Sequence, residues 1–136
     1  MSPAVAGVSP VQGSGSNQTF TFAFSDTKGL QDLGVVNILI NNFLDGRQAC
    51  YLAYSRPLNV LYLVNDAGTA LLPGLSNSQC TVSGSSVTQN GNTLILTLTI
   101  GFSPAFSGNR VIYSAARDYL DANSSCWQPV GVWSVP

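Results

Sequence analysis

The three cysteines have the clearest chemistry of any residues in this 136-residue chain. Cys50 lies in the apolar run ACYLAY, Cys80 lies in the short segment QCTV, and Cys126 lies in a serine-rich loop. This placement favours a disulfide between Cys50 and Cys80 and leaves Cys126 as a free thiol. The bond would close a loop of about 30 residues and stabilise the fold by roughly 3 to 4 kcal/mol. Cys126 would be available to link two chains as a dimer.

Catalytic side chains are scarce. The chain contains no His and no Glu, so the usual nucleophile–base dyads and triads cannot be assembled. Glycosidase chemistry would need two carboxylates that face each other. The six aspartates lie instead in turn-like segments, where Asp caps its own backbone, and they are Asp26, Asp32, Asp45, Asp66, Asp118 and Asp121. We therefore predict that the protein is not an enzyme.

Calcium is the one cofactor that the aspartates suggest. The segment DYLDANSS places Asp118, Asp121 and Asn123 close together, and Asp45 or Asp66 could join them from another loop. Carboxylate and amide oxygens are ligands that calcium prefers, but the segment lacks the fixed spacing of an EF-hand loop. Calcium binding and simple turn capping both remain open from the sequence.

Three tyrosines lie in the segment RQACYLAYSRPLNVLYLVNDAG, residues 47 to 68, and two tryptophans lie near the carboxyl end. They have two interpretations: core or rim residues with hydrated hydroxyl groups, or a platform on which sugar rings stack. The aromatic residues available for such a platform are Tyr51, Tyr54, Tyr62, Trp127 and Trp133.

Composition narrows the class of protein. Only 8% of the residues are charged, the net charge is −1, and 45% are hydrophobic. Five scattered Lys and Arg residues make no basic patch, so nucleic acid is not an expected partner. No apolar run approaches the length of a membrane span. Because charged residues are few, the polar surface must consist mainly of Ser, Thr, Asn, Gln and Gly, a composition common in secreted bacterial modules. We therefore predict a secreted or cell-surface location. Residues 1 to 16 do not resemble a signal peptide.

Alternation of apolar and polar residues predicts an all-β protein. Phe20, Phe22 and Phe24 share one face of QTFTFAFS, and the segments 94–102 and 36–40 repeat the pattern. Further strands are expected at 47–54, 58–65, 79–83, 109–118 and the carboxyl end. Eight or nine short strands separated by turns favour a single antiparallel β-sandwich over residues 1–136, with 1–16 as a flexible or edge-strand segment.

The segment 47–80 is expected to be an inserted hairpin clamped by the disulfide. Its continuous apolar character then reflects burial on two faces, with the outer face covered by the loop GTALLPGLSNSQC. That cover would also bury Leu71, Leu72 and Leu75.

The order of several pieces resembles the immunoglobulin-like repeat modules of large secreted and surface proteins of soil bacteria, Acidobacteria especially. The pieces are VSP with a Gly/Ser stretch, QTFTFAFSDTKG, VVNILINN, LTLTIGFSPAFSGNRVIYSAARD and DANSSCWQPVGVWSVP. The loop RDYLDANSSCW departs from the usual Asp-x-x-Gly-Asn-x-Ser form, because it is longer and has Ala122 where Gly is common.

The resemblance implies an immunoglobulin-like sandwich with a structural or adhesive role between neighbouring domains. Two alternatives remain: a carbohydrate-binding module that uses Tyr51, Tyr54, Tyr62 or Trp127, and a scaffold that presents a variable loop at 117–127. The expected partners are neighbouring domains of a larger protein, or a surface or glycan ligand.

Overall fold

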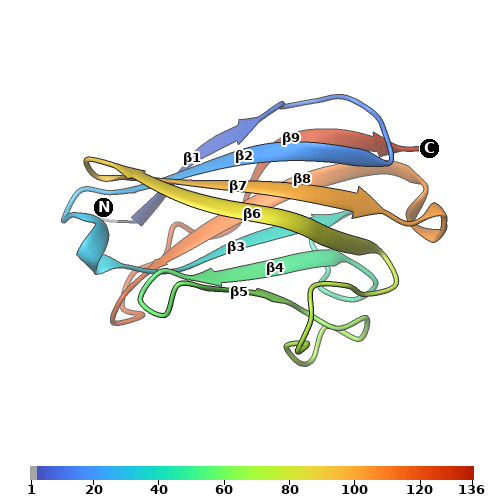
Figure 1. Cartoon of the computed structure of the whole chain (residues 1–136). Coiled ribbons are helices and arrows are strands. Elements are labelled where there is room, and N and C mark those ends of the chain that lie inside the picture. The colour runs from blue at the N-terminus through green and yellow to red at the C-terminus, as the bar shows by residue number, and fades with distance from the viewer. Residues whose placement is uncertain (1–2) are drawn as a thin grey trace.

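The computed structural model describes residues 3–136 as two antiparallel sheets packed face to face (Figure 1). The all-β sandwich predicted from the alternation is thus confirmed. No helix in residues 3–136 has the length and apolar character needed to cross a membrane. The strands are β1 (Pro3–Ser9), β2 (Asn17–Asp26), β3 (Leu33–Asn41), β4 (Cys50–Ser55), β5 (Val60–Leu63), β6 (Cys80–Asn90), β7 (Thr93–Phe102), β8 (Gly108–Asp118) and β9 (Gln128–Val135), with the short 3-10 helices η1 (Leu30–Asp32) and η2 (Pro104–Phe106).

The strand order places β1-β2-β7-β6 in one sheet and β5-β4-β3-β8-β9 in the other. The loops that follow β2, β4 and β8 lie at one end of the sandwich, where β1 begins, and β9 finishes at the opposite end (Figure 1). β6 ends the four-stranded sheet and β5 ends the five-stranded sheet on the same side of the sandwich, where residues of both strands line one hollow.

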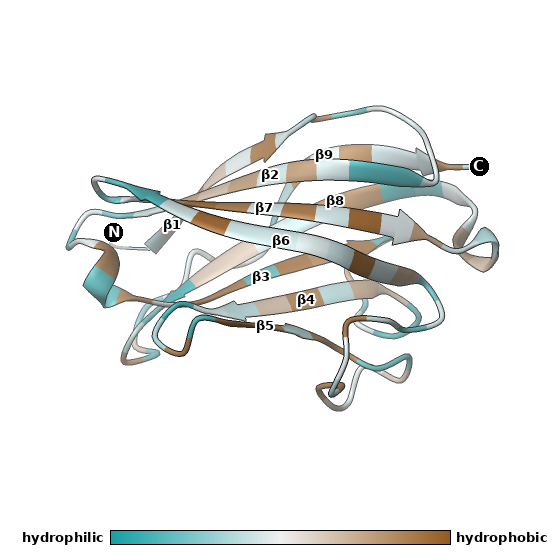
Figure 2. Ribbon diagram, in the orientation of Figure 1, coloured by the Kyte–Doolittle hydropathy of each residue, from teal (hydrophilic) through white to brown (hydrophobic). Residues whose placement is uncertain are grey.

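The core lies between the sheets and consists of the alternating apolar residues of both. Figure 2 shows the alternation along β7, where apolar and polar residues follow one another. Each residue of the predicted inward set is at most 1% exposed, as the sequence predicted. These residues are Phe20, Phe22, Phe24, Val36, Ile38, Ile40, Leu94, Leu96, Leu98 and Ile100.

The disulfide joins the two sheets. Cys50, at the start of β4, is bonded to Cys80, at the start of β6, with 5.6 Å between their Cα atoms. This pairing is the one that the sequence predicted. The hairpin β4–β5 is not attached to the sandwich mainly by this bond, as was predicted for an inserted hairpin, because β4 pairs with β3 from Cys50 to Ser55. The hairpin is therefore an integral edge of the five-stranded sheet.

The amino-terminal region passes from one sheet to the other. β1 pairs with β2, and residues 11–15 then run beside β9 in parallel orientation. Val132 N donates to Val11 O, Ser134 N to Gly13 O, and Gly15 N to Ser134 O. Glycine permits this approach, since a Cβ on Gly131 would lie 2.8 Å from Val11 O. Residues 3–15 are thus tied to both sheets, and residues 1–2 lie outside the described chain.

Candidate functional site

The outer face of the five-stranded sheet carries a shallow aromatic groove. Along β4, Cys50, Leu52 and Tyr54 face the core, so Tyr51 and Ala53 face outward. Tyr62 of β5 lies opposite Ala53 and shares this face. The groove has a volume of about 260 Å³ and is lined by Val35, Asn37, Tyr51, Ala53, Ser55, Tyr62, Val64, Leu71 and Arg117.

This groove corrects the predicted cover of the hairpin. Leu72 and Leu75 pack against the core, as expected. Leu71 is 54% exposed and lines the groove, and Tyr51 and Tyr62 are half-buried, so the loop that follows β5 does not close over the outer face. The apolar run of residues 49–54 is therefore buried on one side and forms an accessible wall on the other.

The four aromatic residues proposed for ligand stacking separate into two groups. Trp127 packs edge-to-face on Tyr51, with 5.9 Å between ring centroids, and extends the aromatic surface. Tyr54 does not belong to it, because it faces the core, is 4% exposed and donates from its hydroxyl to Asn59 Oδ1. Burial raises the pKa of Tyr54, against a smaller lowering by nearby Arg56. Side chains alternate between the two faces of a strand, so Tyr51 and Tyr54, three positions apart, lie on opposite faces. The sequence contained this signal for separating them.

Trp133 is also absent from the outer surface. Its ring is 3% exposed and packs edge-to-face on Phe20, with 5.1 Å between centroids. The indole Nε1 donates to Gly15 O. Trp133 therefore fastens the amino-terminal segment to the core.

The loop 117–127 brings Asp118 and Asn123 together but turns Asp121 away. Asp118 accepts from Ala122 N at 2.7 Å and from Asn123 Nδ2 at 3.0 Å, whereas Asp121 pairs with Arg117 at 3.0 Å. Burial would raise the pKa of Asp118, but the hydrogen bonds from Asn123 and Ala122 lower it overall. Because Asn123 presents its amide nitrogen to Asp118, these contacts favour turn capping over a calcium cage. Cys126, in the same loop, is exposed and has no disulfide partner within residues 3–136.

Two aspartates do lie together, but Asp26 is buried and Asp32 is half-buried. Asp26 is fully buried, and one oxygen of Asp26 and one of Asp32 lack any hydrogen-bond partner. Burial raises the pKa of Asp26, hydrogen bonding from Lys28 N lowers it, and the neighbouring Asp32 raises it further. An enclosed carboxyl of this kind cannot reach a glycosidic bond from solvent.

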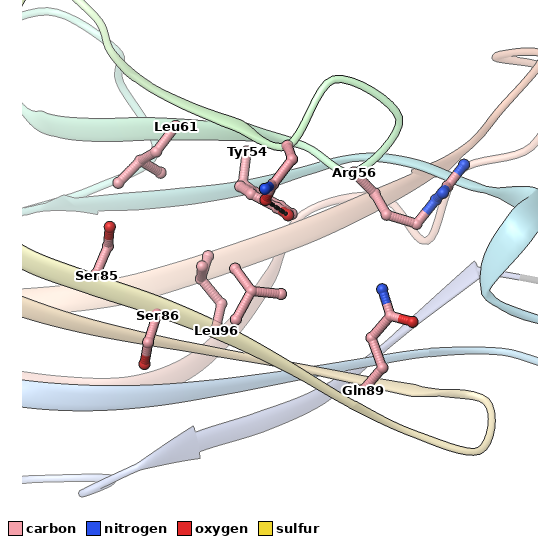
Figure 3. A pocket seen from close by; sticks show the side chains of 9 residues that line it. Tyr54, Arg56, Leu61, Ser85, Ser86, Gln89 and Leu96 are labelled. Atoms are coloured by element: carbon pink, nitrogen blue, oxygen red, sulfur yellow. Dashed lines mark hydrogen bonds between the residues drawn. The ribbon is translucent and has the colours of Figure 1, made fainter.

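A second hollow, which the sequence did not predict, lies at the open side of the sandwich. We call it the edge groove; it lies between the hairpin β4–β5 and strands β6 and β7 and has a volume of about 520 Å³ (Figure 3). Its lining consists of Tyr54, Arg56, Asn59, Leu61, Ser85, Ser86, Val87, Gln89 and Leu96.

The edge groove exists because β6 carries small and polar residues where the neighbouring strands carry large ones. Ser85, Val87 and Gln89 pair with Leu98, Leu96 and Leu94, and so face the opposite sheet. Ser85 and Gln89 are nevertheless exposed. The space between the sheets is therefore open along this side.

No protein-family model matches the sequence, and no curated protein matches it either.

Proposed function

We propose that the chain is a non-catalytic, immunoglobulin-like module of a secreted or cell-surface protein, with a structural or adhesive role. The observation that carries this proposal is the arrangement of the chain ends: β1 begins at one end of the sandwich and β9 finishes at the other (Figure 1). Domains joined through such ends stack along their long axis, which spaces their neighbours apart.

The strand order supports the immunoglobulin-like part of the proposal. Variable-type immunoglobulin domains have the strand orders ABED in one sheet and GFCC′C″ in the other. The order β1-β2-β7-β6 corresponds to ABED, and β9-β8-β3-β4-β5 corresponds to GFCC′C″. The disulfide differs, because it joins the strands that correspond to C′ and D. A disulfide is also compatible with an oxidising, extracellular environment.

The spacing role is tested with a tandem protein in which the carboxyl end of one copy of the chain is joined to the amino end of a second copy. We expect X-ray scattering in solution to give a maximum dimension nearly twice that of a single copy, because the joined ends lie at opposite ends of the sandwich. A tandem protein that folds back, with a maximum dimension close to that of one copy, would contradict the spacing role. A melting temperature equal to that of the single copy serves as the control for folding.

Sugar binding is a second candidate, and the aromatic groove favours it. Tyr51 and Tyr62 combine apolar rings with hydroxyl groups, and Asn37 and Arg117 supply polar groups at the same surface. Arg117 is already paired with Asp121, so its charge is balanced within the chain. This chemistry fits a neutral sugar ring better than an acidic one.

A glycan array tests this second candidate. Here we expect binding to a restricted set of neutral glycans, reduced at least tenfold by Tyr51→Ala, Tyr62→Ala or Trp127→Ala, since truncation of an aromatic residue at the centre of a binding site costs about 2 kcal/mol or more. Tyr119→Ala is the matched control, because Tyr119 is 58% exposed on the loop 117–127 and does not line the groove. Binding that all four variants retain would exclude the groove as the sugar site.

The loop-presenting alternative has a weaker basis. Tyr119 and Leu120 are 58% and 78% exposed, and Leu58, in the turn that follows β4, is 67% exposed. These residues give the loop end of the sandwich an apolar surface that fits contact with a neighbouring domain.

A further inference from the structure

Strand β6 has a long free edge. It pairs with β7 on one side, and it ends the four-stranded sheet on the other. Within residues 3–136, no backbone hydrogen bond joins residues 83–90 to a strand other than β7. Half of the N–H and C=O groups of an edge strand point away from its sheet. Residues 83–90 therefore present a row of donors and acceptors with the spacing of an extended backbone.

This edge lacks the usual protection against strand pairing. Natural edges are commonly blocked by Lys, Pro, a bulge or great shortness. The segment SGSSVTQN contains neither charge nor proline, and the irregularity in the pairing, between Val82 and Gly84, lies at its beginning. The edge of β9 differs, because residues 11–15 run beside it and cover it.

The chain itself already pairs with the first part of this edge. Val82 N donates to Leu75 O, and Ser76 lies opposite Thr81 in an antiparallel bridge. Pro73 and Gly74 precede this contact, so the loop pairs with Cys80–Val82 only and leaves 83–90 uncovered. The edge is thus able to accept an extended segment on this side.

The edge groove supplies a place for the side chains of such a segment. A strand added beside β6 would extend the four-stranded sheet on the side where β5 ends the other sheet, since residues of both β5 and β6 line the edge groove. Its alternate side chains would point toward Leu61, Val87 and Leu96, which form the apolar part of the groove. Figure 3 shows Leu61 and Leu96 on its two sides. With this added segment, each of the two sheets would contain five strands.

A single extended segment fits this position better than a second folded copy. If two copies paired through β6, each would bring its own five-stranded sheet to the same side of the joined sheets. β5 and β6 end their sheets on the same side and line one groove, so the β4–β5 hairpins of the two copies would meet at the junction. A single extended segment brings no second sheet to this side.

Charge specifies the segment further. Arg56 lies at the rim of the edge groove, near Tyr54 and across from Gln89 (Figure 3). Its guanidinium donates to Leu33 O and Gln31 O, but it forms no salt bridge within residues 3–136. An acidic side chain on the incoming segment would balance this charge.

We propose that residues 83–90 and the edge groove bind one extended segment of a partner polypeptide, which adds as a fifth strand to the four-stranded sheet and places an acidic residue beside Arg56. Main-chain hydrogen bonds supply most of the affinity in this mode of recognition, and pockets for alternate side chains supply the specificity. The inference goes beyond the proposed spacing role and does not require it.

The probe is a phage-displayed library of random ten-residue peptides, selected on the whole chain. The selected peptides should alternate apolar residues and share an Asp or Glu. Val87→Lys, which places a charge inside the groove, should weaken a synthetic selected peptide at least tenfold. Thr88→Lys is the matched control, because Thr88 is exposed on the other face of the same strand, and binding should change less than twofold.

Two measurements separate strand addition from simple side-chain contact. N-methylation of alternate peptide backbone nitrogens should reduce binding at least tenfold in one of the two registers, because it removes main-chain donors. Hydrogen exchange should slow at the amides of residues 83–90 in the complex. When the peptide selection is repeated on the Arg56→Gln variant, the preference for an acidic residue should be lost. The melting temperature of each variant shows whether it folds.

Several results would overturn the proposal. The library could fail to yield binding peptides, or a selected peptide could bind Val87→Lys as tightly as the original chain. N-methylation could leave the affinity of the peptide unchanged in both registers. Slower hydrogen exchange in the complex could be confined to the surface around Tyr51 and Tyr62. A stable dimer of the free chain that protects residues 83–90 would also overturn it, because a second copy would then occupy the edge.

Discussion

Replacing Phe22 by alanine should lower the free energy of unfolding by about 3–5 kcal/mol, the cost typical of removing a buried aromatic ring. Phe22 is 0% exposed, pairs with Leu96 on β7, and lies 6.0 Å from Phe20 between ring centroids. The loss has two parts: the transfer of the ring into the core and the cavity that remains. Urea denaturation followed by tryptophan fluorescence measures it.

The matched control is Thr21→Ala on the same strand. Thr21 is half-buried and lies opposite Thr97, on the outer face of the sheet. We expect its replacement to change the free energy of unfolding by less than about 1 kcal/mol. Equal effects of the two substitutions would mean that β2 does not present Phe22 to the core.

Removal of the disulfide by Cys50→Ala together with Cys80→Ala should lower the free energy of unfolding by roughly 3–4 kcal/mol, the value for closure of a loop of about 30 residues. The bond ties the start of β4 to the start of β6, so its loss should affect the connection between the sheets first. Denaturation under non-reducing conditions measures the change, and Cys126→Ser is the control that should leave stability unaffected.

Hydrogen exchange should then locate the weakened region. The amides of β4 should stay protected, because β4 is bonded to β3 along its whole length. The loop of residues 64–79 should exchange faster, since it leads directly into Cys80 and belongs to neither sheet, although Asn77 Nδ2 still donates to Ala49 O and Val64 O. Rapid exchange throughout β4 and β5 would show instead that the bond holds the hairpin in place.

The strands with large apolar residues on one face could be predicted from the sequence, because burial on that face demands alternation. β6 was predicted only as 79–83, whereas it extends to Asn90. Its later residues are Ser, Gly, Thr and Gln, which indicate a loop when read alone. They form a strand here because the backbone of β7 offers them a continuous set of hydrogen-bond partners.

The candidate surfaces were less predictable than the core. The disulfide could be inferred, because two of the cysteines lie in apolar or strand-like segments. The edge groove could not, since it depends on the unequal width of the two sheets and on which strand lies opposite which. Tyr54 was grouped with Tyr51 on composition, although their positions along one strand place them on opposite faces.

The parallel contact between residues 11–15 and β9 has a mechanical consequence. β1 leads back to one end of the sandwich, and β9 leads out of the other. A pull on the two chain ends along the long axis would therefore slide these segments past each other. The hydrogen bonds from Val132 N, Ser134 N and Gly15 N would bear the load together instead of opening one after another. A module held in this way resists stretching more strongly than its equilibrium stability alone would suggest.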